Sequence, residues 1–232
     1  MKKSAIENIV REKRFKHKGS KLMGAPMEEY KQKFVEFLLK SNALKFGEFT
    51  LKSGRISPYF FSTASFYSGS STSSLASFYA DAIKSRLGDK FDIIFGPAYK
   101  GISLAVSTCT ALFSKYKLDK NWCFDRKEAK TYGDCKAAGT NNILVGAPLK
   151  ETERIILIDD VLTTGAAKEE AIGKIRAISP KSKITAVFIA FDRQEKDMGG
   201  KNASLEFEKK FGAKVHSIIS AGEAFEYLKE KG

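Results

Sequence analysis

The chain has 232 residues, a length typical of one globular domain or slightly more. Hydrophobic residues make up 43% of it and charged residues 29%, so the chain can bury a sizeable core. Its three cysteines form no Cys-x-x-Cys pair, which excludes a disulfide framework and argues against a structural zinc site. The longest uncharged apolar stretches, 101–113 and 184–191, are too short to span a bilayer, and no secretory h-region follows the basic start. We therefore expect a cytoplasmic protein without a membrane partner.

The chain is strongly basic, with 40 lysines and arginines against 27 acids and a formal net charge of +13. Such a balance favours an anionic partner, which could be a nucleic acid, a membrane surface or a phosphorylated small molecule. Charge alone does not choose among the three. Because eight bases and two acids fall within residues 1–26, we expect these residues to form a basic extension, followed by a single domain over 27–232.

The regular pattern begins after that extension. Apolar residues recur at helical spacing up to Leu44 and predict an amphipathic helix over about 27–40. Short strands are predicted at 49–51 and 59–61, on either side of a turn. A second helix is expected around 75–83.

The rest of the chain alternates apolar strands with helical patterns. The helical patterns cover Ile102–Phe113 and Ala166–Ile178. Such alternation predicts an α/β fold, a parallel sheet flanked by helices on both faces, with ligands bound where strands end and helices begin. The expected strands are Phe91–Phe95, Trp122–Phe124, Ile155–Ile158 and Ile184–Phe191, with Val215–Ile219 as a fifth candidate.

The strongest motif follows the strand Ile155–Ile158. Two adjacent acids, Asp159 and Asp160, precede a small-residue loop that opens a helix. The loop amides and the positive end of the helix dipole form a cradle for phosphate. The two acids would repel a phosphate, so we expect them to bind hydroxyl groups instead. A ribose 5-phosphate suits the whole motif, because its hydroxyl groups can meet the acids while its phosphate meets the loop. No basic residue stands near the two acids in the sequence. Neither of the nucleotide-binding motifs G-x-G-x-x-G and G-x-x-x-x-G-K-[ST] occurs in the chain, which argues against those nucleotide sites.

Other strand ends carry suitable cations. The tight loop Gly96–Gly101 presents Lys100, a point charge suited to diphosphate oxygens. Three cations within Arg126–Lys130 precede the polar stretch 131–142. This pattern is typical either of a mobile flap that closes over a ligand or of a solvated charged loop. Arg193 follows a long apolar strand, and its guanidinium could bind a carboxylate through two parallel hydrogen bonds.

These segments carry a family resemblance. Asp159–Ala167 resembles the motif with which type I phosphoribosyltransferases bind 5-phosphoribosyl 1-diphosphate (PRPP). Together with 45–61, 95–101, 126–130 and 191–195, it makes the chain from about Met27 onwards similar to the orotate phosphoribosyltransferases. The resemblance implies transfer of the ribose 5-phosphate group of PRPP to orotate, giving orotidine 5′-monophosphate and pyrophosphate in pyrimidine biosynthesis. It also implies a type I phosphoribosyltransferase-like sheet over about 67–220, with a small hood built mainly from 27–66 plus C-terminal elements.

The resemblance further implies roles for individual residues. Lys130, Asp159 and Asp160 would be catalytic, and Mg²⁺ would be held mainly by substrate and water. Orotate would contact Phe60, Phe61, Thr163 and Arg193. PRPP would bind Lys52, Tyr99, Lys100, Arg126, Lys127, Lys130, Tyr132, Asp159, Asp160, Val161, Leu162, Thr163, Thr164, Gly165, Ala166 and Ala167.

The resemblance also bears on the assembly of the protein and on its choice of base. The resemblance implies a homodimer in which the flap Arg126–Tyr132 closes over the partner's active site. Tyr132 stands where the family commonly has a histidine, and the loop 134–142 is longer than in the family. The alternatives are a phosphoribosyltransferase for another base and a PRPP-sensing regulator that binds nucleic acid. No helix-turn-helix or aromatic single-strand platform supports the regulator, so no nucleic-acid partner is expected.

Overall fold

The computed structural model describes residues 26–50, 56–128, 143–163, 165–194 and 202–231. The expected extension 1–26 lies outside these residues except for Pro26. No helix in the described part of the chain is long and apolar enough to cross a membrane.

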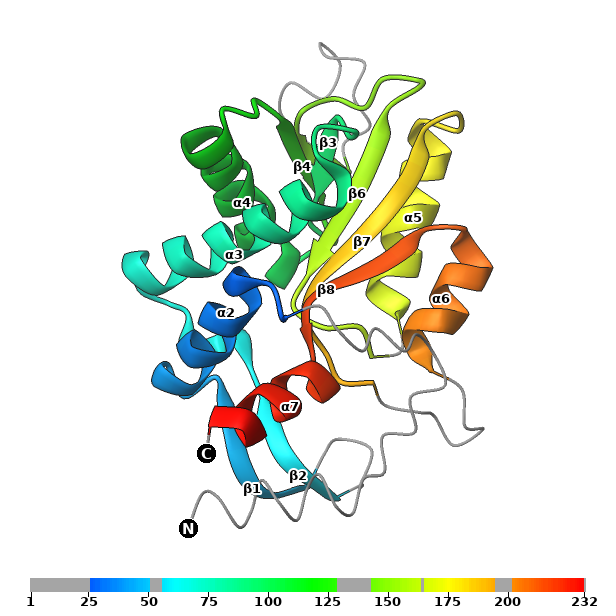
Figure 1. Cartoon of the computed structure of the whole chain (residues 1–232). Helices are drawn as coiled ribbons and strands as arrows, with labels where there is room; N and C mark the ends of the chain where they lie inside the picture. Colours follow the sequence, from blue (N-terminus) through cyan, green and yellow to red (C-terminus); the bar gives the residue numbers. More distant parts are fainter. Residues whose placement is uncertain (1–25, 51–55, 129–142, 164, 195–201, 232) are drawn as a thin grey trace.

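A six-stranded sheet forms the centre of the fold, with the strand order β5-β4-β3-β6-β7-β8 (Figure 1). All neighbours in it pair in parallel except β5, which pairs antiparallel with β4 at one edge. The α/β class and the five predicted parallel strands are confirmed, whereas β5 was not predicted. The strands are β3 (Ile93–Phe95), β4 (Asn121–Asp125), β5 (Leu144–Gly146), β6 (Arg154–Asp159), β7 (Lys183–Asp192) and β8 (Lys214–Ser220).

Helices cover both faces of this sheet because side chains alternate along each buried strand. Ile156 and Ile158 of β6 belong to the hydrophobic cluster formed with α2, α3 and α4, whereas Ile155 and Leu157 belong to the cluster formed with α5 and α6. The helices are α2 (Glu29–Lys40), α3 (Gly69–Leu87), α4 (Lys100–Tyr116), α5 (Ala166–Ile178) and α6 (Ala203–Phe211).

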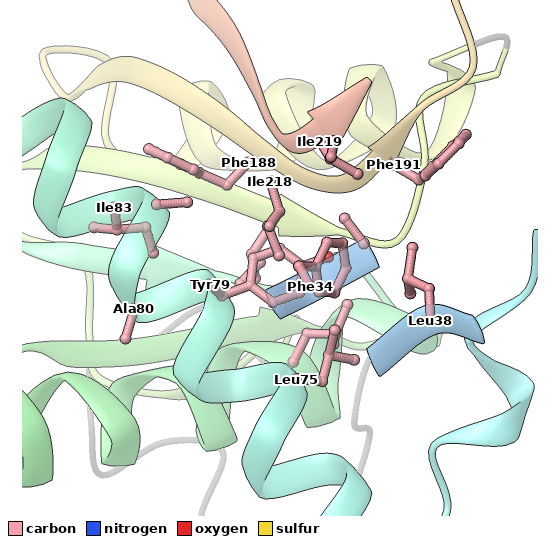
Figure 2. Close-up of a cluster of buried hydrophobic side chains, with 14 of the residues drawn as sticks. Phe34, Leu38, Leu75, Tyr79, Ala80, Ile83, Phe188, Phe191, Ile218 and Ile219 are labelled. Carbon is pink, nitrogen blue, oxygen red and sulfur yellow. The ribbon is translucent and has the colours of Figure 1, made fainter. Parts of the chain in front are cut away.

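The larger cluster lies between α2, α3 and the strands β7 and β8 (Figure 2). Phe34 of α2, Tyr79 of α3 and Phe188 of β7 are fully buried in it. Burying side chains of this size contributes on the order of 1.5–3 kcal/mol each. Helix α2 is therefore part of the same packed body as the sheet.

A small antiparallel pair, β1 (Leu44–Thr50) and β2 (Ile56–Phe61), lies beside the C-terminal helix α7 (Ala221–Lys231) (Figure 1). Phe225 of α7 packs against Tyr59 of β2 and Phe46 of β1, at centroid distances of 5.2 and 5.9 Å. The short 3-10 helix η1 (Thr63–Ser65) then leads from β2 towards α3. Strands β1 and β2, from the amino-terminal part of the chain, thus pack with the C-terminal helix α7 in one layer.

The predicted helix over about 27–40 is confirmed as α2, but Leu44, which matched its spacing, lies beyond the end of the helix. Helix α2 ends at Lys40, Asn42 adopts a positive φ of 55°, and Leu44 opens β1. Its side chain is nonetheless buried in the same cluster, which explains why its spacing matched the helix.

Candidate functional site

The residues expected to carry chemistry gather at the carboxyl ends of the parallel strands. The loop after β3, the ends of β4 and β6, and the end of β7 all lie at this edge, because parallel strands point the same way. Contacts between these segments join them into one site.

The acid pair at the end of β6 is balanced by two lysines. Lys100 Nζ, at the start of α4, lies 2.6 Å from Asp160 Oδ2, and Lys168 Nζ of α5 pairs with Asp159 Oδ2. Asp160 is buried, and burial raises the pKa of Asp159 while the Lys168 ammonium opposes that shift. Both lysines are remote from the acids in the sequence, Lys100 by 60 residues from Asp160 and Lys168 by 9 from Asp159, so the fold supplies the basic partners.

Hydrogen bonds from other layers fix the backbone and side chains of the same pair. The Tyr79 hydroxyl of α3 donates to the Asp159 carbonyl at 2.7 Å. The Thr63 hydroxyl of η1 donates to Asp160 Oδ2 at 3.2 Å, which connects the small β1–β2 layer to the acids. The Asp160 carbonyl accepts the N–H of Ala190 in β7 at 2.9 Å. The acids are thus held from both sides.

The loop after the acids leads directly into α5. Gly165 caps the helix with a φ of 78°, a left-handed conformation that favours glycine, and a Cβ there would lie 3.2 Å from the Phe207 ring. Thr163, Ala166 and Ala167 are exposed, whereas Leu162 is buried. An exposed first helical turn offers a positive dipole end, as expected for a phosphate cradle.

The loop between β3 and α4 is unusually tight. A Cβ on Gly96 would lie 2.1 Å from the Gly101 carbonyl oxygen, so no side chain fits at that position. The peptide between Ala98 and Tyr99 is cis. Tyr99 is 73% exposed, and Lys100 starts the helix.

A buried carboxylate supports this loop from β4. Asp125 accepts the Ala98 N–H at 2.8 Å and the Lys174 ammonium of α5 at 2.6 Å. Lys174 also pairs with Glu170, which in turn pairs with Lys127 at 3.2 Å. This chain of contacts joins α5 to the root of the expected flap, where Arg126 and Lys127 are exposed.

The segment after β7 meets the small β1–β2 layer. The Arg193 guanidinium donates to the Phe61 carbonyl at 3.3 Å, and the Tyr59 hydroxyl donates to the Arg193 carbonyl at 3.2 Å. The Nε of Arg193 is buried with no hydrogen-bond partner among the described residues. Phe60 is 38% exposed. Phe61 places its ring in the core, stacked on Phe191 at 4.9 Å, so that its backbone is the part directed at Arg193.

Four predicted site residues, Lys52, Lys130, Tyr132 and Thr164, lie outside the described residues. The others lie in the loop after β3, at or just after the ends of β4, β6 and β7, or in β2. Sequence reasoning missed several residues that the structure places in contact with the predicted ones, among them Lys168 and Tyr79 beside Asp159 and Thr63 beside Asp160. Within the described ranges, no group of three or more His, Cys, Asp or Glu side chains is placed to hold a metal ion.

Comparisons with known proteins agree on one family. Residues 70–228 match the family described as phosphoribosyl transferase domain. An orotate phosphoribosyltransferase from Clostridium acetobutylicum is 42% identical over 205 residues, covering 88% of this chain and 88% of that protein. Another from Vibrio parahaemolyticus is 46% identical over 206 residues, covering 89% and 92%. The crystal structure of orotate phosphoribosyltransferase from Francisella tularensis superposes with a TM-score of 0.74 at 42% identity, covering 85% of this chain and 90% of that one.

Proposed function

This chain belongs to the orotate phosphoribosyltransferases, enzymes of pyrimidine biosynthesis, and we propose how its residues divide the reaction among themselves. The ribose 5-phosphate group of PRPP passes to orotate, and pyrophosphate leaves. The observation that carries the proposal is that three groups lie together: the acids after β6, the first turn of α5, and Arg193. Arg193 is linked to the acids through β2 and η1, because it donates to the Phe61 carbonyl while Thr63, two residues further on, donates to Asp160.

The acids and the following loop bind the ribose phosphate. Asp159 and Asp160 accept hydrogen bonds from the two ribose hydroxyl groups, since ionised carboxylates act only as acceptors. The 5-phosphate lies in the loop Val161–Ala167, at the amino end of α5. Because each acid already has a lysine partner, the phosphate does not face two uncompensated negative charges.

The departing pyrophosphate needs cations more than a nucleophile. As the bond from ribose C1 to the pyrophosphate oxygen breaks, positive charge develops on the ribose and negative charge on the pyrophosphate, a charge pattern like that of glycoside hydrolysis. Lys100 and Tyr99 present donors beside that position, and Lys52, Arg126, Lys127 and Tyr132 complete the diphosphate site. Lys130 makes the contact that strengthens in the transition state, which is electrostatic stabilisation of the leaving group.

We propose Mg²⁺ as the cofactor, held by PRPP oxygens and water. The donor set fits this role, because Asp159 and Asp160 are engaged by lysines and the described residues offer no cluster of three ligating side chains. Mg²⁺ commonly retains water and binds through substrate phosphates in this way. When bound, it would neutralise part of the charge on the leaving group.

The base lies between the end of β7 and the β1–β2 layer. Arg193 binds the orotate carboxylate with its guanidinium, while Phe60, the backbone of Phe61 and Thr163 border the ring. The buried Arg193 Nε supports this assignment, because a guanidinium with an unused donor has hydrogen-bonding capacity left for a ligand. The carboxylate is the group that distinguishes orotate from uracil.

Arg193→Ala tests the base assignment. We expect the KM for orotate to rise roughly 10- to 150-fold, because a charged hydrogen-bonded contact contributes about 1.5–3 kcal/mol. The KM for PRPP should change far less in the same steady-state measurement. Arg154→Ala is a matched control, since Arg154 pairs with Asp92 at the amino ends of the strands. If the KM for PRPP rose instead, Arg193 would belong to the phosphate site.

We also propose a homodimer with shared active sites, in which the flap Arg126–Tyr132 closes over the partner's site. An isologous interface makes such sharing reciprocal. The flap root supports the idea, because Lys127 and Arg126 stand exposed at the strand ends while Glu170 and Lys174 hold them to α5. A cytoplasmic location is proposed on the free thiols of Cys109 and Cys123.

A further inference from the structure

Lys168 is a buried charge in an otherwise apolar position. It lies on the buried stripe of α5 with Ala171, Ile172 and Ile175, and its side chain is only 4% exposed. A buried ammonium is costly unless it is paired and hydrogen-bonded. Ordinary packing of α5 against the sheet would favour an aliphatic residue at this position, so the lysine calls for a local reason.

The partners of its ammonium give that reason. Lys168 Nζ contacts Asp159 Oδ2 and also donates to the Val161 carbonyl at 2.9 Å. The other carboxylate oxygen, Asp159 Oδ1, accepts the Asp160 N–H at 2.9 Å. One ammonium therefore ties the carboxylate to the loop that follows it, and the two donors together fix the orientation of that carboxylate.

The two lysines of the acid pair differ in one respect. The Lys100 side chain is 66% exposed, so it can leave Asp160 and move to a bound diphosphate. The Lys168 side chain is only 4% exposed and its ammonium also donates to the Val161 carbonyl, so it is confined beside Asp159. Lys168 is thus a buried counter-ion, and Lys100 an exposed one.

We propose that Lys168 is a positioning residue for PRPP binding, which acts by holding the Asp159 carboxylate in the orientation that accepts the ribose hydroxyl groups. The inference rests on the proposed function of the acid pair. It assigns to α5 a second role, beyond offering its amino end to the 5-phosphate.

The test compares PRPP affinity in Lys168→Met, Asp159→Asn and the double variant, measured by titration calorimetry in the presence of Mg²⁺. We expect Lys168→Met to raise the Kd for PRPP at least about tenfold, the lower end for loss of a charged contact. When Asp159 is already Asn, Lys168→Met should change the Kd for PRPP by less than about twofold. If Lys168 acts only through Asp159, the effects of the two substitutions are not additive. The KM for orotate at saturating PRPP should stay near the wild-type value.

Lys31→Met is the matched control. Lys31 is also a buried lysine, 8% exposed, and pairs with Glu223 of α7 at 2.5 Å, outside the acid pair and its loop. The Lys31→Met variant should have a lower Tm, because it leaves Glu223 without its buried partner. Its Kd for PRPP should be unchanged. Should Lys168→Met fail to fold by circular dichroism, Lys168→Leu, which also removes the N–H donors, takes its place in the same cycle.

A Kd within about twofold of wild type in the Lys168 variant would overturn the inference, as would an equal effect in both backgrounds. A wild-type chain that binds PRPP and transfers nothing to orotate would overturn the proposed function, while the binding comparison would still decide the role of Lys168. A wild-type chain that does not bind PRPP would overturn both.

Discussion

The double variant Asp159→Asn with Asp160→Asn should lose nearly all turnover. Each carboxylate supplies a charged acceptor to the ribose hydroxyl groups, and losing two such contacts lowers kcat/KM by roughly 10²- to 10⁴-fold. The substitution also removes the partner of buried Lys168, so the Tm should fall. Activity is therefore measured well below the Tm, with circular dichroism on the same sample to show that the fold is kept.

Asp92→Asn is the control for that variant. Asp92 is likewise a carboxylate with a basic partner, but it binds Arg154 at the opposite edge of the sheet. Its variant should keep wild-type kcat/KM. Near-normal turnover in the double variant, with the fold intact, would contradict the assignment of Asp159 and Asp160 to the ribose.

Mixing two inactive variants should restore activity if the flap serves the partner's site. Lys130→Ala lacks the leaving-group contact, and Arg193→Ala lacks the carboxylate contact, so each should be nearly inactive at orotate concentrations far below the raised KM. After joint unfolding and refolding in equal amounts, about half of the dimers should be mixed, and one of the two sites in each should be complete. Activity should then recover to roughly a quarter of wild type.

The control for mixing is each variant refolded alone, which should stay nearly inactive. Mass spectrometry of the refolded sample shows whether mixed dimers have formed. Mixed dimers without recovered activity would mean that Lys130 acts within its own subunit. The shared-site proposal would then be wrong, while the assignments of Asp159 and Arg193 would stand.

The central sheet could be predicted because its strands are continuous apolar runs, and the acid motif because its residues are consecutive. Helix α6 could also have been predicted, since Asn202 caps its first turn and Gly212 ends it with a φ of 70°. Strand β5 carries no such signal. It has three residues, Leu144–Gly146, and owes its place to pairing with β4.

The site was less predictable than the fold because its supporting contacts join distant parts of the chain. Thr63 and Asp160 are 97 residues apart, and Asp125 and Lys174 are 49 apart, so spacing alone does not reveal them. Lys168 did leave a trace in the sequence, as a charged residue on the apolar stripe of α5. Such a residue indicates a buried partner, although only the fold identifies that partner as Asp159.

One assay tests directly which base this enzyme uses. The purified chain is mixed with PRPP and Mg²⁺, and orotate, uracil, adenine and guanine are offered separately while absorbance is followed. We predict that orotate is consumed with one pyrophosphate released per orotidine 5′-monophosphate formed, and that the bases without a carboxylate are not turned over. Turnover of uracil or a purine, with no turnover of orotate, would contradict the assignment of orotate as the substrate.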